Sequence, residues 1–360
     1  MSQPGEAPQQ DQTTTAQKLT LHASRLFADW LMQAGGSLAF TTYQAGKIFM
    51  IGVNRETGRL SVYERDFERC MGLGTGSDGT VWLSSLYQLW RFENFLAPGE
   101  AQDGYDAVYV PLEGRTTGDV DVHDVHPLPD DRPPLFVVTR FNCIATLDQR
   151  SSFVPVWRPP FIDRIAAEDR CHLNGLAMDN DQPAYVTCVA GTNIAGAWRN
   201  NRREGGLVLD VTSGETVASG LSMPHSPRLH NGRLYVIQSG AGEFGYIDLA
   251  TGHFEAICFL PGFARGMTFL GDYAIIGVSR PRRDRTFEGL ALQERLQAEK
   301  VPPECMLAVV RLDTGDIEHT LEIGGAVSEL YDVCALPGIH RPKILGFKSQ
   351  EIRFAIRLGE

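Results

Sequence analysis

The sequence predicts an all-β protein built as a six-bladed β-propeller, and three observations lead to this fold class. The 360 residues include 37 Gly and 20 Pro, and only 21% of them are charged, which suits a turn-rich β protein better than a helical bundle. From Ser37 onward, short apolar runs alternate with turn residues, as strands and hairpins do. Six related segments recur at irregular intervals of about 40 to 65 residues, a pattern typical of blades with loop insertions.

The six related segments are interpreted as the inner strands of the blades. Each begins with polar residues and continues as an apolar strand, and most are followed by a turn and a second apolar strand. The segments are RCMGLG (69–74), DVHDVHPL (121–128), CHLNGLAM (171–178), PHSPRLHNGRLYV (224–236), ARGMTFLGDYAIIG (264–277) and ELYDVCALPG (329–338). A second repeat predicts hairpins, because in it a strand reaches Asp, turns at Thr-Gly or Ser-Gly and returns. It occurs at 210–217, 248–255 and 311–318.

The number of blades depends on how the ring closes. Three strand-like runs follow Ser37, and KILGF (343–347) and IRFAIRL (352–358) lie near the other end of the chain. If these runs share one blade, the propeller has six blades and its sheet edges are paired. A seven-bladed propeller is the alternative, and a long two-sheet sandwich is the less specific one.

The remaining segments complete the predicted domain organisation. Residues 1–20 are polar and poor in aromatic residues, which predicts a disordered tail and a single propeller domain over 21–360. Leu26, Phe27 and Trp30 repeat at helical spacing before two glycines, so a helix is expected over 22–34. A second helix is expected in an insertion near 284–300, where leucines again recur at helical spacing.

Charge and cysteine content exclude several classes of protein. The net charge of −11 argues against nucleic acid or an anionic membrane as the main partner. No apolar stretch reaches 18 residues, so no membrane span is expected. Residues 1–17 carry no Lys or Arg and no apolar run, so no secretory signal is expected. Seven Cys without a CxxC pair indicate free thiols and a cytoplasmic location. The oligomeric state does not follow from these features.

Three histidines are the most informative candidates for a functional site. His123, His172 and His225 fall at the starts of three consecutive inner-strand segments. Because inner strands line the central channel of a propeller, we expect these side chains to converge near the axis. Three imidazoles on one ring of strands predict a transition-metal site for zinc or iron, with open positions for water or substrate.

Further ionisable side chains accompany these histidines at the starts of the inner strands. Asp124, Glu329 and Tyr331 are candidate acid–base residues, and Arg228 and Arg265 could hold a carboxylate by paired hydrogen bonds. Asn174 is a further substrate-binding candidate. Asn174, Glu329 and Asp332 together could also form a calcium site.

Long sequence motifs resemble a known family. SLAFTTYQAGKIFMIG, TGDVDVHDVH, AAEDRCHLNGLAM, GLSMPHSPRLHNGRLYV, PGFARGMTFLGDYAIIGVSRPR and SELYDVCALPG resemble an uncharacterised bacterial conserved-hypothetical family, a domain of unknown function. The resemblance covers residues 36–350 and implies no activity. At the level of fold, the chain is also similar to six-bladed propellers of the NHL and gluconolactonase-like groups.

A second resemblance concerns chemistry rather than sequence motifs. The peptidyl-amidoglycolate lyase propeller holds zinc with three His and has Arg and Tyr nearby, and His123, His172, His225, Arg265 and Tyr331 are similar to that set. The leading hypothesis is therefore a metal-dependent lyase or hydrolase for a small or peptidyl substrate with a carboxylate. The alternative is a non-catalytic binding or scaffold module for a peptide or protein partner.

Overall fold

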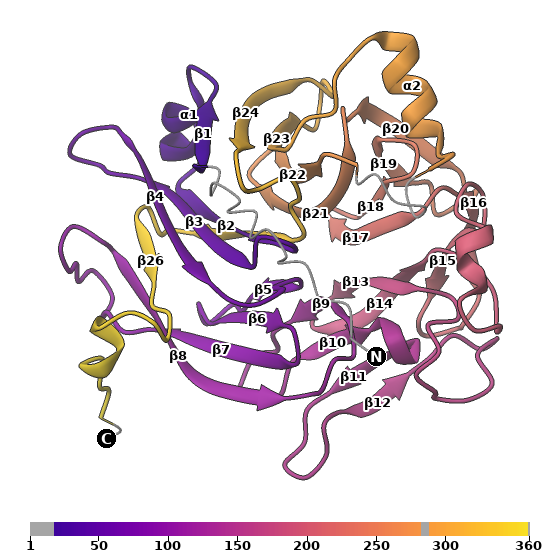
Figure 1. The fold of residues 1–360 in the computed structure, drawn as a ribbon, viewed down its shortest axis with the longest axis horizontal. Helices are drawn as coiled ribbons and strands as arrows, with labels where there is room; N and C mark the ends of the chain where they lie inside the picture. Colours follow the sequence, from indigo (N-terminus) through magenta and orange to yellow (C-terminus); the bar gives the residue numbers. More distant parts are fainter. Residues whose placement is uncertain (1–17, 282–287, 359–360) are drawn as a thin grey trace, which may run out of the picture.

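Six sheets stand around one central axis in the computed structural model, which describes residues 18–281 and 288–358 (Figure 1). Each inner strand contacts the inner strand of the next sheet, so the ring is complete. The protein is therefore a six-bladed β-propeller, as predicted, and the seven-bladed alternative is wrong. Each of the six predicted inner-strand segments overlaps the innermost strand of a blade.

Blades are numbered here along the chain, and their strands are given from the axis outward. Blade 1 contains β25 (Val333–Pro337), β2 (Gly36–Thr42), β3 (Lys47–Val53) and β4 (Leu60–Asp66). Blade 2 contains β5 (Leu73–Thr75), β6 (Val81–Ser85), β7 (Gln88–Asn94), β8 (Ala107–Thr116) and β26 (Pro342–Ile344). Blade 3 contains β9 (Val122–His126), β10 (Leu135–Val138), β11 (Cys143–Thr146) and β12 (Val154–Trp157).

The second half of the ring follows the same plan. Blade 4 contains β13 (Leu173–Asp179), β14 (Gln182–Cys188), β15 (Gly206–Asp210) and β16 (Thr216–Leu221). Blade 5 contains β17 (Pro224–His230), β18 (Arg233–Gln238), β19 (Glu243–Ile247) and β20 (Phe254–Phe259). Blade 6 contains β21 (Phe263–Leu270), β22 (Tyr273–Ser279), β23 (Met306–Arg311), β24 (Ile317–Gly324) and β1 (Thr20–Ala23). The predicted Asp-to-Gly turns join the third and fourth strands of blades 4, 5 and 6, at Gly214, Gly252 and Gly315, whose φ values lie between 74° and 78°.

Ring closure differs from the prediction in its C-terminal part. Strand β25 supplies the inner strand of blade 1 and pairs antiparallel with β2. KILGF does not share this blade, because β26 pairs in parallel with β8 of blade 2. IRFAIRL forms no strand, since a 3₁₀ turn, η3 (Glu351–Arg353), begins that segment. Both runs were predicted as strands of the closing blade, a position that β25 already fills.

The helices are shorter than predicted. Helix α1 (Phe27–Gln33) begins five residues after the predicted start at His22, because Thr20–Ala23 forms β1 and pairs with β24 at the edge of blade 6. In the insertion, α2 (Ala291–Glu299) is helical, whereas 282–287 lie outside the described residues. Residues 1–17 of the predicted tail also lie outside them. Two 3₁₀ helices, η1 (Thr139–Phe141) and η2 (Ala197–Asn200), connect strands in blades 3 and 4.

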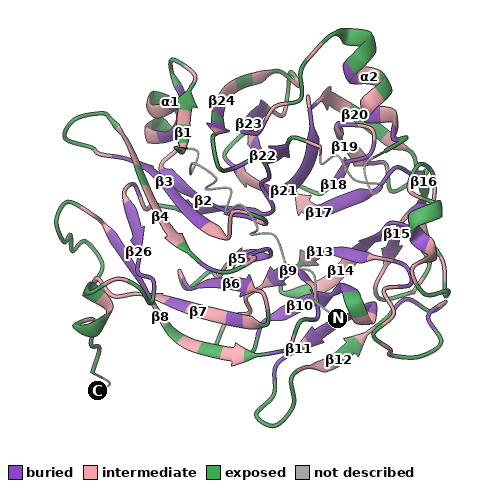
Figure 2. Ribbon diagram, viewed as in Figure 1, coloured by how far each residue is buried: buried purple, intermediate pink, exposed green. Residues whose placement is uncertain are grey.

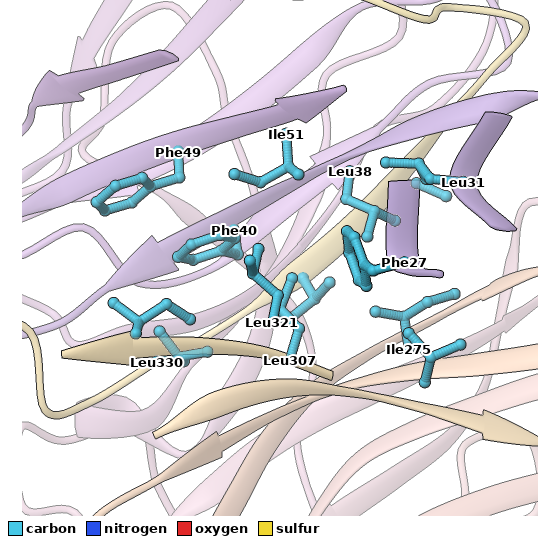
Figure 3. Packing of buried hydrophobic residues seen from close by; sticks show 14 of the residues in the cluster. Phe27, Leu31, Leu38, Phe40, Phe49, Ile51, Ile275, Leu307, Leu321 and Leu330 are labelled. Atoms are coloured by element: carbon cyan, nitrogen blue, oxygen red, sulfur yellow. The ribbon is translucent and has the colours of Figure 1, made fainter. Parts of the chain in front are cut away.

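An apolar cluster lies in each of the six interfaces between neighbouring blades. The two faces of β3 show the cause: Ile48 and Met50 pack toward blade 2, whereas Phe49 and Ile51 pack toward blade 6, because successive side chains of a strand point to opposite faces. The purple strands in Figure 2 are therefore buried on both sides. Figure 3 shows α1 adding Phe27 and Leu31 to the cluster between blades 1 and 6.

Candidate functional site

The nine predicted site residues form one cluster at the end of the channel where the inner strands begin. A cavity there, the central site, has a free volume of about 10 Å³, roughly the room for one water molecule. It is lined by His123, Asp124, Asn174, His225, Ser226, Arg265, Tyr331 and Asp332. The other three predicted residues contact this lining: His172 packs on His123, Glu329 pairs with Arg265 and Arg228 pairs with Asp124.

Irregular backbone brings these side chains to the axis. Asp121, His172 and Ser226 have φ values of 60°, 53° and 50°, a left-handed conformation that non-glycine residues rarely adopt. The pairing of β13, β17 and β21 also shifts register near the cavity. Bulges of this kind re-aim side chains and are frequent beside functional sites.

The hydrogen bonds around His123 fix which ring nitrogen carries the proton. The Thr139 hydroxyl donates its only hydrogen to the Leu173 carbonyl at 2.6 Å, so toward His123 Nδ1, 2.7 Å away, it must accept. The Asp121 carbonyl also accepts from Nδ1 at 3.1 Å. Nδ1 therefore bears the hydrogen, and in the neutral ring Nε2 presents a bare lone pair.

The same arrangement recurs at His225. The Ser239 hydroxyl donates to the Ala264 carbonyl and accepts from His225 Nδ1 at 3.0 Å, while the Met223 carbonyl accepts at 2.8 Å. Burial lowers the pKa of His225 below its ordinary range. Burial likewise lowers the pKa of His123 to about 4. Both rings are therefore neutral at pH 7, with Nε2 as the acceptor.

His172 is held differently, by a carboxylate. Its Nδ1 lies 3.1 and 3.2 Å from the two carboxylate oxygens of Asp169. The ring stacks on Trp198 of η2, with 4.0 Å between ring centroids, and meets His123 edge-on at 5.0 Å. Its side chain is 13% exposed, compared with 6% for His123, so it lies nearer the mouth of the channel.

The three imidazoles do not show the grouping of a metal centre. Within residues 18–281 and 288–358, no three His, Cys, Asp or Glu side chains are placed so that they could hold one metal ion. Orientation of Nδ1 by the protein is nevertheless what metal-ligating histidines require. The predicted zinc or iron ion stays a prediction.

Arg265, Glu329 and Tyr331 form one side of the cavity. The Arg265 guanidinium binds the Glu329 carboxylate and lies over the Tyr331 ring, 4.5 Å from its centroid. Burial raises the pKa of Tyr331 well above its ordinary value, although the nearby Arg265 opposes this effect. Tyr331 therefore keeps its proton and can act only as a donor toward an acceptor in the cavity.

Three buried donors around the cavity have no hydrogen-bond partner among the described residues. They are Asn174 Nδ2, Arg265 Nε and Tyr331 Oη. Their residues are 4%, 8% and 4% exposed. A buried donor without a partner costs about 1–3 kcal/mol, so three of them beside one cavity indicate a place for an acceptor atom.

An ion-pair network adjoins the cavity, since two of its members, Asp124 and Asp332, line it. Arg228 binds both oxygens of Asp124, at 2.8 and 3.0 Å, and lies 3.8 Å from Asp332. Burial favours the neutral form of Asp124, but Arg228 outweighs it and holds the pKa of Asp124 below its usual range. Burial and the neighbouring Asp124 raise the pKa of Asp332 to about 7. Arg228 is thus occupied by carboxylates of the protein itself.

The same carboxylates also join blades. Asp124 accepts from the Leu176 amide of blade 4, and Asp332 accepts from the Leu73 amide of blade 2. Asp124 and Arg228 therefore also join blades, while the catalytic and substrate-binding roles expected for them stay predictions.

Several residues of the site were missed in the sequence. Thr139 and Ser239 orient His123 and His225, and Asp169 and Trp198 orient His172. A signal for the hydroxyl residues exists, because in every blade except blade 4 the apolar run of the second strand is followed by Ser or Thr. The spacing of Asp169, three residues before His172, was the only sign of the carboxylate.

Comparisons with known proteins place the chain in a family but give no activity. A family profile described as Domain of unknown function (DUF4915) matches residues 25–345, nearly the whole propeller and the resemblance noted above. No curated protein matches the sequence. Within the described part of the chain, no helix has the length and apolar character needed to span a bilayer.

Solved structures share the fold at low sequence identity. A chain from the crystal structure of a nidogen/laminin complex is 11% identical, with a TM-score of 0.52, over 84% of this chain and 99% of that one. A Bacteroides caccae protein of unknown function is 13% identical, with a TM-score of 0.51 and the same coverage. A streptogramin B lyase is 15% identical, with a TM-score of 0.40, over 67% and 72% of the two chains. The first two likenesses show a shared fold and no activity.

Proposed function

The chain belongs to the family described as a domain of unknown function (DUF4915), and we propose that its central site is the active site of a hydrolase or lyase for a substrate with a carboxylate or carbonyl group. The observation that carries this proposal is the set of three unpaired donors, Asn174 Nδ2, Arg265 Nε and Tyr331 Oη, beside a cavity of atomic size. Donors arranged in this way stabilise an oxygen that gains negative charge during a reaction.

The size of the cavity suits one oxygen atom rather than a whole substrate. A carbonyl or carboxylate oxygen would enter the cavity, while the rest of the substrate stays at the channel mouth. Arg265 keeps its positive charge, since its pKa is raised by Glu329 and Tyr331 despite its burial. Tyr331 keeps its proton for the reason given above. Both groups therefore remain donors at neutral pH.

The neutral imidazoles supply the base that both reactions need. In hydrolysis, an Nε2 lone pair takes a proton from water, whose oxygen attacks the carbonyl carbon, and the resulting oxyanion occupies the cavity. The bond to the leaving group then breaks, and the leaving group takes the proton from the imidazolium. In elimination, the same Nε2 takes a proton from the carbon next to the carboxylate. The enolate oxygen is held by the donors, and the departing group again takes the proton.

The test compares Tyr331→Phe with Tyr109→Phe. Both tyrosines bury a hydroxyl without a partner among the described residues, but Tyr109 lies in the apolar cluster between blades 1 and 2, away from the channel. Acetate, oxalate, malonate and N-acetylglycine are the binding probes, followed by thermal shift, and 4-nitrophenyl acetate is the acyl probe. Both variants should be more stable than the wild type by about 1 kcal/mol or more, because an unpaired buried hydroxyl is lost.

Only Tyr331→Phe should lose function. Binding of the best carboxylate should weaken about tenfold or more, since a hydrogen bond to a charged group is worth roughly 1.5–3 kcal/mol. Hydrolysis of 4-nitrophenyl acetate should fall in the same variant and persist in Tyr109→Phe. Equal behaviour of the two variants, or no response of the wild type to any probe, would overturn the proposal.

The ion-pair network of Arg228 is the observation that favours a second candidate, a non-catalytic module for a peptide or protein partner. Arg228, Asp124 and Asp332 bind one another, as buried polar groups with a purely structural role do. Under this alternative, the wild type responds to none of the small probes.

A further inference from the structure

Asp169, His172 and Trp198 form a hydrogen-bonded and stacked unit at the mouth of the central site. The Trp198 indole Nε1 donates to Asp169 Oδ2 at 2.8 Å, and the other carboxylate oxygen, Oδ1, accepts from His172 Nδ1 at 3.1 Å. The indole ring also covers the imidazole, with an angle of 26° between the planes. Two of the three residues thus fix the ring plane and the tautomer of the third.

This unit differs from the environments of the other two imidazoles. The hydrogen bonds of His123 and His225 from Nδ1 go to neutral carbonyl and hydroxyl oxygens, whereas that of His172 goes to a carboxylate. Burial favours the neutral form of Asp169, but His172 and Trp198 outweigh it and keep the pKa of Asp169 below its usual value. When an imidazole ring takes a proton, a neighbouring carboxylate stabilises the resulting imidazolium more than neutral oxygen atoms do.

Solvent exposure also distinguishes His172 from the other two imidazoles, because His172 is the most exposed of the three. The His172 side chain is 13% exposed and the His123 side chain 6%, and His225 is buried. Only one oxygen atom of the substrate fits in the cavity, so the general base must reach a proton outside the cavity. His172, in ring contact with the cavity-lining His123, lies where the rest of that substrate would be.

We infer that His172 is the general base of the proposed reaction, with Asp169 and Trp198 as its positioning residues. This inference rests on the proposed function of the central site and assigns one group in it. The proton moves from water, or from the carbon next to the carboxylate, to His172 Nε2, and later from Nε2 to the leaving group. Asp169 stays ionised throughout.

The variant that tests the unit is Asp169→Asn. An amide can donate to His172 Nδ1, which would move the ring hydrogen to Nε2 and remove the lone pair needed by a base. Asp121→Asn is a matched control, because Asp121 lies 3.8 Å from His123 Nδ1. Both aspartates have a positive φ, 43° and 60°, a conformation that asparagine tolerates.

Two measurements report on the unit without a known substrate. The first is the tautomer of each histidine, obtained from two-bond ¹H–¹⁵N spectra of protein labelled at histidine. The second is the rate at which diethyl pyrocarbonate modifies His172, followed by peptide mass spectrometry. We expect the Nδ1–H tautomer at His172 in the wild type and in Asp121→Asn. In Asp169→Asn we expect a change to the Nε2–H tautomer at His172. The rate at which His172 is modified should fall about tenfold or more.

Trp198→Phe adds a second, milder variant. It keeps an aromatic ring on His172 and removes only the N–H bond to Asp169, so a smaller fall in the modification rate is expected. An Nε2–H tautomer at His172 in the wild type, or no change in Asp169→Asn, would overturn the inference. Tyr331→Phe should leave both measurements unchanged, so failure here is distinct from failure of the proposed function.

Discussion

The ionised form of Asp332 destabilises the folded protein, and Asp332→Asn tests how much. Its pKa rises from an ordinary value of 3.8 to about 7 on folding, because the carboxyl is buried and faces Asp124. A raised pKa in the folded state means that stability is lost as pH rises from about 4 to about 7. Each pH unit is worth about 1.4 kcal/mol, so the loss at pH 8 is roughly 4 kcal/mol.

The asparagine variant keeps the shape of the side chain and loses the charge. Asp332 accepts from the amides of Leu73 and Val333, each at 2.9 Å, and an amide oxygen replaces only one of the two acceptors. Losing the other costs about 1 kcal/mol. Asp332→Asn should therefore be less stable than the wild type by about 1 kcal/mol near pH 4, and more stable by roughly 3 kcal/mol at pH 8.

Denaturant unfolding followed by tryptophan fluorescence between pH 4 and 8 measures this difference. Asp124→Asn is the control with the opposite sign, because Asp124 ionises readily beside Arg228 and its loss should destabilise the protein at pH 8. A parallel pH dependence in wild type and Asp332→Asn would refute the reasoning. So would a less stable Asp332→Asn at pH 8.

Two further predictions concern contacts between blades. Arg228→Met should lower the free energy of unfolding by about 3–5 kcal/mol, because two buried carboxylates lose their cation. Adding Asp124→Leu should restore most of the lost stability. Equal stability of the single and double variants would contradict this prediction. Thr139→Val should cost about 1–3 kcal/mol, since the hydroxyl joins His123 to the Leu173 carbonyl of blade 4. Thr146→Val, whose hydroxyl bonds Pro134 in its own blade, should cost less in the same unfolding assay.

The repeat of the inner strands made most of the fold predictable. A polar start followed by an apolar run marks the place where a strand enters the buried ring, and all six such segments overlap an inner strand. Closure was not predictable in full, because β25 and the KILGF run are both apolar and nothing local tells which of them pairs with β2. The choice depends on the geometry of the finished ring.

The candidate site was predictable as a location and less so as chemistry. Inner-strand starts converge in any propeller, which is why nine residues spread over more than 200 positions meet. Which arginine is occupied could not be predicted, since Arg228 and Asp124 are 104 residues apart and their contact depends on the angle between blades 3 and 5. A repeat visible in the sequence is a hydroxyl residue that donates to a backbone carbonyl in, or just before, the inner strand of the next blade. These residues are Thr41, Ser84, Thr139, Ser239 and Ser279.

The pairing of β25 with β2 determines the order in which the blades can be completed during synthesis. Leu38 and Ala335 are partners, so the first complete strand of blade 1 waits for a partner made almost 300 residues later. At a synthesis rate of about 5–20 residues per second, this wait lasts roughly 15–60 s. During that time, blades 3 to 5 and the first four strands of blade 2 can form while the inner edge of β2 has no strand beside it. The last step of folding is then the one that turns an open arc into a ring, and it is the step most exposed to aggregation.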